Sequence, residues 1–336
     1  MKRTYSESGF SLIELLVAMT VLLTVSSIVT SALLQMTSSQ ATIWNRTEMH
    51  SGIRGATELL QQEVGQAGRI TLPGIVRLHD PVVANNPATP CNPGTPTSPA
   101  VVVNLDTSAT TGTAVSGMFA LGGANPAYIM LTTMDGNQSE SIKVGQILTG
   151  PARITACFAK AHAAGTVLLP MGGFATGIIP PTGVLNGSTA TKLKLFGDIN
   201  GDGNMVYVEY TCDTALHNLY RNVMPFDQNP ATKPPLTDGL ILLGNIMLNP
   251  GGTPCFTYQT TPMLVQGTTF TFVLDVAVTL TVQTQNVDPV TKQFQTETKA
   301  LLNVSPRNVF NTWALASIGY TDRIQSTPTS VTSLLP

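Results

Sequence analysis

The chain has 336 residues, of which only 11% are charged, and its 17 lysines and arginines are set against 19 aspartates and glutamates. This balance argues against a nucleic-acid binder, which needs clustered cations, and against a highly charged disordered chain. Apolar residues make up 43% of the chain, enough for a folded core, and 29 glycines and 23 prolines indicate many turns. Together with abundant serine and threonine, this composition favours a β-rich protein outside the cytoplasm.

The chain begins with a short polar stretch, followed by a long apolar run. Residues 1–9 read MKRTYSESG, and residues 10–34 are almost wholly apolar. A helix of about 25 residues is long enough to cross a bilayer, and Lys2 and Arg3 before it predict a cytoplasmic N-terminus. Glu14 interrupts the run near its start. An unpaired carboxylate is costly in lipid, so Glu14 needs a partner.

The heptapeptide GFSLIEL at residues 9–15 resembles the processing site of type IV prepilins. The resemblance implies that prepilin peptidase cuts between Gly9 and Phe10, removes residues 1–9 as a leader and methylates the Phe10 amine. It also implies that Glu14 faces the Phe10 amine of a neighbouring subunit during assembly. A buried amine and carboxylate that satisfy each other would set the axial register.

Two other interpretations of the apolar run remain open. One is a secretory signal peptide cleaved near Thr30-Ser31-Ala32, and the other is a plain membrane anchor. The run is long for a signal peptide. Neither interpretation accounts for the combination of Gly-Phe with a glutamate four residues after the phenylalanine.

The helical pattern continues beyond the membrane segment as an amphipathic stretch. Its polar flank comes close to the apolar face at Arg46 and Glu63, so the amphipathicity is imperfect. Gly68 and Pro73 give a stop signal, which predicts one helix from about Phe10 to Ala67. The second half should pack against a globular head. The apolar face comprises Met49, Ile53, Leu60, Val64 and Ala67.

The helix end, LLQQEVGQAG at residues 59–68, resembles that of PilW-like minor pilins and the related minor pseudopilins of type II secretion, with Gly65 in place of the usual arginine. Residues 219–221, 255–258 and 306–308 add to this likeness. The resemblance implies a pilin-like α+β fold, in which the long N-terminal helix packs on an antiparallel β-sheet head with large loop insertions.

The head consists of strands and loops. Prolines exclude regular structure over residues 80–100, and residues 75–190 form a large inserted region. The pair at 269–284 and 297–304 is the clearest, with Asp288-Pro289 as its turn. Further strands are expected at 100–105, 128–133, 142–148, 205–211 and 240–248. The chain then divides into a leader (1–9), a transmembrane or filament-core helix (10–34), an amphipathic continuation (35–68), a β-rich head (69–323) and a loose C-terminal tail (324–336).

Four cysteines are present, and none has the spacing of a zinc finger or a CxxC redox motif. In an exported chain they suggest two disulfides, for which three connectivities exist. We favour Cys212–Cys255, because both lie in apolar, strand-like segments, which leaves Cys91–Cys157. Four buried free thiols are the alternative.

One stretch has the spacing of a calcium loop, D-x-N-x-D-G followed by a glutamate. Its flanks suggest strands, so the EF-hand fold does not fit. An unmetallated turn is an equal alternative, since Asn, Asp and Gly form turns unaided. Structural Ca²⁺ is the one ion suggested, and no cofactor is required. The candidate ligands are Asp198, Asn200, Asp202, the Asn204 carbonyl and, least suited by strand alternation, Glu209.

An enzyme is not expected, because no acid–base constellation, nucleophile elbow or P-loop is present and the four histidines share no ligand spacing. The resemblance implies a minor pilin at or near the tip of a type IV pilus that helps to prime the filament. Alternatives are a minor pseudopilin of type II secretion and a tip adhesin or DNA-uptake module; no nucleic acid is clearly indicated.

The expected partners are prepilin peptidase, other minor pilins, the major pilin and the inner-membrane assembly machinery. Before assembly the chain should be a single-pass inner-membrane protein with its N-terminus in the cytoplasm. After assembly it should lie in an extracellular pilus or a periplasmic pseudopilus.

Overall fold

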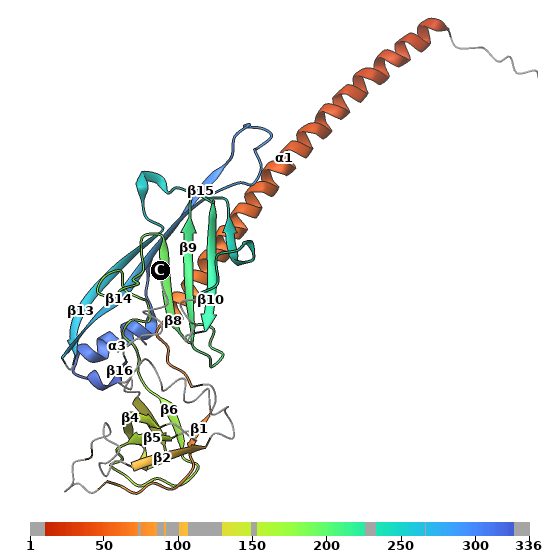
Figure 1. Cartoon of the computed structure of the whole chain (residues 1–336). Helices are drawn as coiled ribbons and strands as arrows, with labels where there is room; N and C mark the ends of the chain where they lie inside the picture. Colours follow the sequence, from red (N-terminus) through yellow and green to blue (C-terminus); the bar gives the residue numbers. More distant parts are fainter. Residues whose placement is uncertain are drawn as a thin grey trace, which may run out of the picture. The chain divides into compact units, whose positions relative to one another are not determined.

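The computed structural model describes residues 11–72, 75–85, 91, 101–106, 130–148, 153–225, 233–265 and 267–325. The chain forms two compact units. The first comprises the chain up to Gly52 together with Gln283–Glu297, and the second comprises Ile53–Val282 and the chain from Thr298. The fold is α+β, with one long N-terminal helix and antiparallel sheets (Figure 1).

The long helix α1 spans Leu12–Gln66, 55 residues. Gly68, two residues after the helix, has a φ of 80°, a left-handed conformation that favours glycine and ends helices. A Cβ there would also lie 2.9 Å from Val309 Cγ2, so the end of the helix and its packing require the same small residue. The end predicted at Ala67 is confirmed within one residue, whereas the predicted start, Phe10, lies outside the described residues.

The C-terminal part of α1 is held in the second unit by its apolar face. Ile53, Leu60, Val64 and Ala67 are each at most 1% exposed, as the periodicity predicts. The first of the two large sheets in this unit has the order β11-β10-β9-β8, with all neighbours antiparallel. Its strands are β8 (Lys192–Gly197), β9 (Val206–Asp213), β10 (Asn218–Pro225) and β11 (Ile241–Gly244).

The second large sheet is built around the long strand β14, which pairs with β12, β13 and β15. The single strand predicted at 240–248 is in fact two, because Asn245 takes a φ of 57°. The chain changes sheets there: β11 pairs with β10, whereas β12 pairs with β14. The strands are β12 (Ile246–Met247), β13 (Phe256–Val265), β14 (Thr268–Gln283) and β15 (Thr296–Val304).

The inserted region forms a small closed barrel of six strands, in the order β1-β2-β5-β4-β3-β6. Sequence predicted an insertion here but not its closure. The side chains of β1 are buried, exposed and buried in turn, as expected where alternate side chains of a strand point into a barrel. The strands are β1 (Val76–Leu78), β2 (Val101–Asp106), β3 (Met130–Met134), β4 (Ser141–Leu148), β5 (Arg153–Ala156) and β6 (Val167–Pro170).

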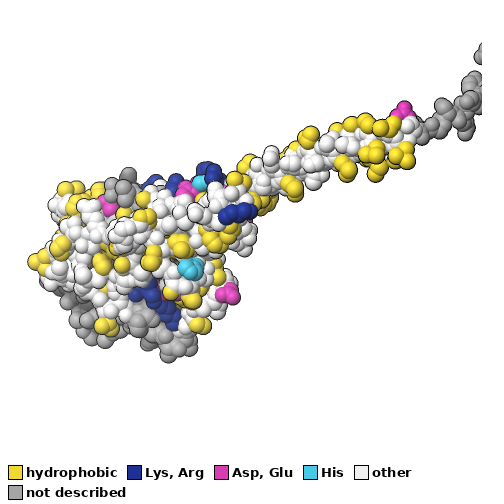
Figure 2. Space-filling view, turned by 90° about the horizontal axis from the view of Figure 1, so that it is seen from above, with side chains coloured by type: hydrophobic (Ala, Val, Ile, Leu, Met, Phe, Trp, Pro, Cys, Tyr) yellow, Lys and Arg dark blue, Asp and Glu magenta, His cyan; other side chains and the backbone are white. Residues whose placement is uncertain are grey.

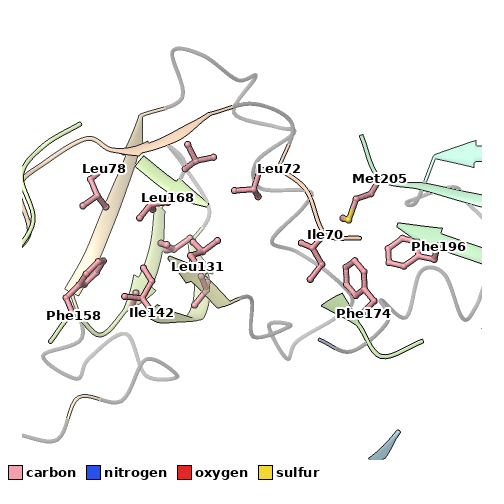
Figure 3. Close-up of a cluster of buried hydrophobic side chains, with 14 of the residues drawn as sticks. Ile70, Leu72, Leu78, Leu131, Ile142, Phe158, Leu168, Phe174, Phe196 and Met205 are labelled. Atoms are coloured by element: carbon pink, nitrogen blue, oxygen red, sulfur yellow. The ribbon is translucent and has the colours of Figure 1, made fainter. Parts of the chain in front are cut away.

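A continuous apolar core joins the barrel to the first sheet. In Figure 3, Leu72 lies between the barrel side chains and a group that contains Phe174, Phe196 and Met205. The Phe174 and Phe196 rings are 4.7 Å apart between centroids. Because both ends of this cluster are fully buried, the barrel packs against the sheet and is not a free appendage.

The remaining elements are short and were mostly not predicted. Helix α3 (Arg307–Ser317) follows β15 and buries Val309. Strand β16 (Ile324–Gln325) pairs in parallel with β7 (Gly173–Phe174), so the first two residues of the predicted loose tail are in fact ordered, and residues 326–336 lie outside the description. Within the described residues, 3₁₀ helices lie at Gly136–Gln138, Asp238–Leu240, Pro250–Gly252 and Thr321–Arg323.

Two disulfides close the fold. Cys91 is bonded to Cys157, just after β5, across 66 residues of sequence. Cys212 on β9 is bonded to Cys255 before β13, across 43 residues, and so joins the two large sheets. The favoured pairing is confirmed, and the free-thiol alternative does not apply.

Candidate functional site: the N-terminal helix and its attachments

The start of α1 carries the residue that the sequence ties to assembly. Glu14 lies in the first turn, and its Oε2 accepts a hydrogen bond from the Ser11 backbone N–H at 3.0 Å. Ser11 and Glu14 thus form the reciprocal half of a capping box, which satisfies one of the free N–H groups at a helix start. Among the described residues, the other oxygen, Oε1, has no hydrogen-bond donor and is open to one. Gly9 and Phe10 lie outside the described residues.

The first half of α1 is an exposed apolar surface. One 18-residue window has a mean hydropathy of 2.3 and none of it is buried, so the helix is long and apolar enough to cross a membrane. Leu12 is 81% exposed and Leu22 65%, and Figure 2 shows such side chains along the helix. A soluble monomer rarely exposes so much contiguous apolar surface, which therefore needs a cover of lipid or protein.

Further along α1, one flank of the helix is contacted by residues 284–297, which comprise the connection between β14 and β15 and the first two residues of β15 and are called the 284–297 loop below. Asp288 holds this loop in shape, because its Oδ1 accepts the backbone N–H groups of Val290 at 2.7 Å and Thr291 at 3.0 Å. These hydrogen bonds, that from Thr291 first, hold the pKa of Asp288 below its usual range. Three helix residues spaced four apart each contact the loop. The pairs are Thr42 with Asp288, Arg46 with Gln295, and His50 with Glu297.

The C-terminal part of α1 is attached to the first sheet by a buried ion pair. Glu63 is only 3% exposed, and its carboxylate accepts hydrogen bonds from Arg221 Nε at 3.0 and 3.2 Å. The Tyr210 hydroxyl donates to Glu63 Oε2 at 2.5 Å. Burial raises the pKa of Tyr210, and Glu63 raises it further, so this hydroxyl stays protonated. Burial alone would lower the pKa of Arg221, but the bond to Glu63 outweighs it and raises that pKa.

Sequence reasoning placed Glu63 near the apolar face but gave it no role. The signal that could have identified it is an acid on the buried face of a helix, which requires a cation from elsewhere in the fold. Arg221 was noted only for its likeness to minor pilins, and the structure shows what it does.

The structure places Glu209, a predicted calcium ligand, in an ion-pair cluster. Its carboxylate lies 2.8 Å from Lys233 Nζ and 3.6 Å from Lys192 Nζ, and it accepts the Tyr207 hydroxyl at 3.0 Å. Burial raises the pKa of Glu209, but Lys233 and Lys192 outweigh it and hold that pKa below its usual range. Two cations already neutralise this carboxylate, so it is not free for a metal ion.

The rest of the calcium motif forms a turn. Asp202 Oδ1 accepts the Asn204 backbone N–H at 2.9 Å, as Asp does in turns without a metal. Asp198 is 1% exposed, and Arg69 Nε lies 3.6 Å from its Oδ2. Among the described residues, no three His, Cys, Asp or Glu side chains gather as a metal site. Calcium at Asp198, Asn200, Asp202 and Asn204 stays a prediction.

Comparison with known proteins bears on the N-terminal segment. Residues 5–30 match the prokaryotic N-terminal methylation motif, a range that includes Gly9, Phe10 and Glu14. No curated protein and no solved structure matches the chain. This match supports a type IV prepilin-like protein. The motif implies processing by prepilin peptidase and assembly with other pilins, and the apolar helix fits anchoring in the inner membrane before assembly.

Proposed function

We propose that the protein is a minor pilin of a type IV pilus, located at the filament tip, where it helps to prime assembly. The observation that carries the proposal is the exposed apolar half of α1 directly behind a prepilin-type methylation motif. Its role is structural and not enzymatic. Its partners are prepilin peptidase, the major pilin, other minor pilins and the inner-membrane assembly machinery.

In this proposal, cleavage between Gly9 and Phe10 frees an amine one residue before the capping box. Lipid covers the apolar surface of α1 until neighbouring helices replace it. Glu14 Oε1, which has no donor among the described residues, then accepts the methylated Phe10 amine of a neighbour. An amine and a carboxylate removed from water together stabilise each other only when both are present, which favours one axial register.

The head supports a minor rather than a repeating subunit. A closed barrel at residues 76–170 is inserted between the end of α1 and the first sheet. This insertion also favours a second candidate function, a binding module at the tip, because packing of α1 into a filament does not require it. A minor pseudopilin of type II secretion shares the N-terminal features, and the long head favours the pilus.

Mass spectrometry of the N-terminal peptide in membranes and sheared filaments tests the proposal. The expected mature chain begins at methylated Phe10 and is present in filaments. A chain that keeps residues 1–9, or that begins near Ala32, would overturn it.

The Glu14→Ala variant tests the role of this carboxylate. It should reduce incorporation of the chain into filaments, while cleavage after Gly9 continues. Glu58→Ala, which removes an exposed carboxylate on the same helix, is the matched control.

Deletion of the gene separates the two candidate functions. Loss of pili means a role in assembly. Normal pili that no longer attach to surfaces mean that the head acts as a binding module, and loss of secretion without loss of pili would point to the pseudopilin alternative.

A further inference from the structure

The 284–297 loop extends along α1 toward the apolar half of the helix. Its three contacts with α1 follow one another in order, and each contact nearer the N-terminus of the helix involves a residue nearer the middle of the loop. The pairs are His50 with Glu297, Arg46 with Gln295, and Thr42 with Asp288. The loop turns over residues 288–292, because the Asp288 N–H donates to the Gln293 carbonyl at 3.0 Å and the Lys292 N–H to the Asp288 carbonyl at 2.8 Å. This tip is therefore the end of the loop nearest the apolar half of α1, and Figure 1 shows the blue loop beside the helix.

The uncharged part of α1 is long enough to cross both headgroup layers of a bilayer. No residue between Glu14 and Arg46 is charged. At about 1.5 Å per residue these two residues are about 48 Å apart along the helix, and an ordinary tilt of about 20° reduces the height to about 45 Å. A bilayer with its headgroup layers is about 40–45 Å thick. Glu14 and Arg46 thus match its two outer edges, where charged side chains are solvated.

This placement puts the residues just before Arg46 in the outer headgroup layer. The layer is about 5–8 Å deep on each side of the hydrocarbon core. Thr42 lies about 6 Å inside the level of Arg46. Trp44 lies between them and is 74% exposed, and tryptophan is enriched at this depth. Because Thr42 contacts Asp288, the tip of the loop lies at the depth of the phospholipid headgroups.

The tip presents the side chains of a membrane-binding surface. Val290 is 64% exposed and Phe294 48%. Lys292 is exposed, whereas Asp288, the only acid among residues 285–294, is 2% exposed and bonded to backbone N–H groups of its own loop. The loop thus keeps its carboxylate inside and turns apolar side chains and a cation outward. That combination binds at the boundary between the headgroups and the acyl chains.

We infer that the tip of the 284–297 loop docks on the phospholipid surface of the bilayer that α1 crosses, on the side opposite the N-terminus. Val290 and Phe294 enter the boundary between headgroups and acyl chains, and Lys292 pairs with lipid phosphates. The depth of Thr42 argues for lipid as the occupant, because a surface held at that depth lies among headgroups. The inference rests on the membrane-spanning helix and not on the filament role, and it adds a membrane contact outside the helix. Extraction of the chain from the bilayer then also requires release of this loop.

Fluorescence quenching by lipids tests this inference. The full-length chain is reconstituted at no more than one molecule per vesicle, in phosphatidylcholine mixed with phosphatidylglycerol. The native cysteines are paired in disulfides, so Val290→Cys supplies a single thiol for a nitrobenzoxadiazole probe. Lipids spin-labelled at the headgroup or at the top of the acyl chain should quench this probe.

A probe at Ile318→Cys is the matched control. Ile318 is 70% exposed and directly follows α3, whose Val309 packs at Gly68, beyond the C-terminal end of α1. The probe there should not be quenched by lipid. Equal quenching at positions 290 and 318 would overturn the inference. A probe at position 290 whose emission shifts to shorter wavelength without quenching by lipid would mean that the loop packs on protein, and would also overturn it.

Variants of the neighbouring side chains show whether the tip itself causes docking. Phe294→Ser, combined with the probe at position 290, should remove most of the quenching. Lys292→Gln should weaken it only in vesicles that contain phosphatidylglycerol. Leu264→Ser, which removes a side chain 70% exposed on β13, should leave it unchanged. Hydrogen exchange of residues 285–295 identifies variants in which the loop keeps its shape.

The outcomes separate this inference from the proposed function. Undiminished quenching in a Phe294→Ser variant with an intact loop would show that the probe enters the bilayer by itself, and would refute the docking. A chain that docks in vesicles but never enters filaments would overturn the proposed function alone. A chain that enters filaments but shows no quenching at position 290 in vesicles would overturn the docking alone.

Discussion

Glu63 on α1 and Arg221 on β10 are joined through both carboxylate oxygens, in a site where the carboxylate is 3% exposed. A buried charge that loses its partner is strongly destabilising, whereas an apolar replacement of the whole pair is often tolerated. The two residues therefore form one stabilising unit that attaches the helix to the sheet.

We expect Glu63→Leu or Arg221→Met alone to lower the free energy of unfolding by about 3–5 kcal/mol, because each leaves an uncompensated buried charge. The double variant should recover most of this loss. Thermal unfolding of the full chain in detergent measures all four states of the cycle. Arg54→Ala removes an exposed i,i+4 pair with Glu58 and should leave the stability almost unchanged. Single variants as mild as this control would show that the pair does not hold the helix.

Because of Lys194, the free energy of unfolding of the head should depend on pH in the alkaline range. Burial lowers the pKa of this lysine to about 8. Between pH 8 and 10 the unfolded chain keeps a proton that the folded protein has lost, so the free energy of unfolding should rise with pH, by on the order of 2 kcal/mol. Denaturant unfolding at several pH values measures the slope, and Lys194→Met should flatten it. Equal slopes in both proteins would contradict the assignment to Lys194.

The Cys91–Cys157 and Cys212–Cys255 disulfides should both appear as linked peptides when the unreduced protein is digested. Replacing either pair by serine is expected to cost about 2–4 kcal/mol of stability, since each closes a long loop of the unfolded chain. Detection of Cys91 linked to Cys212 or Cys255 would mean a different connectivity from the one described.

Asp288 should control the order of the 284–297 loop. Asp288→Ala removes the acceptor of two backbone N–H groups and the contact with Thr42, so hydrogen exchange of residues 285–295 should accelerate. The pKa of this carboxylate is lowered, so in the unmodified chain the same loosening should appear only at a pH below the usual titration range of an aspartate. Asp213→Ala removes a similar acceptor in the β9–β10 turn and should leave the 284–297 loop unaffected.

The long helix and β14 were predictable because their patterns are local. The period of the apolar residues located the buried face of α1, and Gly68 marked its end. The alternation of Val276, Val278, Leu280 and Val282 identified β14, and each of these side chains is at most 2% exposed. Both elements bury a face that can be recognised within a few consecutive residues.

The features that were missed depend on residues far apart in the sequence. Glu63 meets Tyr210 and Arg221 across 147 and 158 residues, and no local pattern records such a contact. The barrel closes only when β1 pairs with β6, about ninety residues later. Glu209 fitted the calcium spacing, but its lysines come from β8 and from the chain after β10. The spacing of a motif does not show whether one of its candidate metal ligands is already paired with residues that are distant in the sequence.

The unbroken course of α1 has a mechanical consequence. In the proposed pilus the chain is pulled along the filament axis, and α1 contains no proline, the residue that most strongly kinks a helix, from Leu12 to Gln66. The load then falls on the point where the helix meets the sheet, which is the bond between Glu63 and the Arg221 and Tyr210 side chains. The hydrogen bonds from Arg221 and Tyr210 share the Glu63 carboxylate, so displacing that carboxylate breaks all of them at once. The attachment of the helix to the sheet therefore resists a force along the helix as one unit.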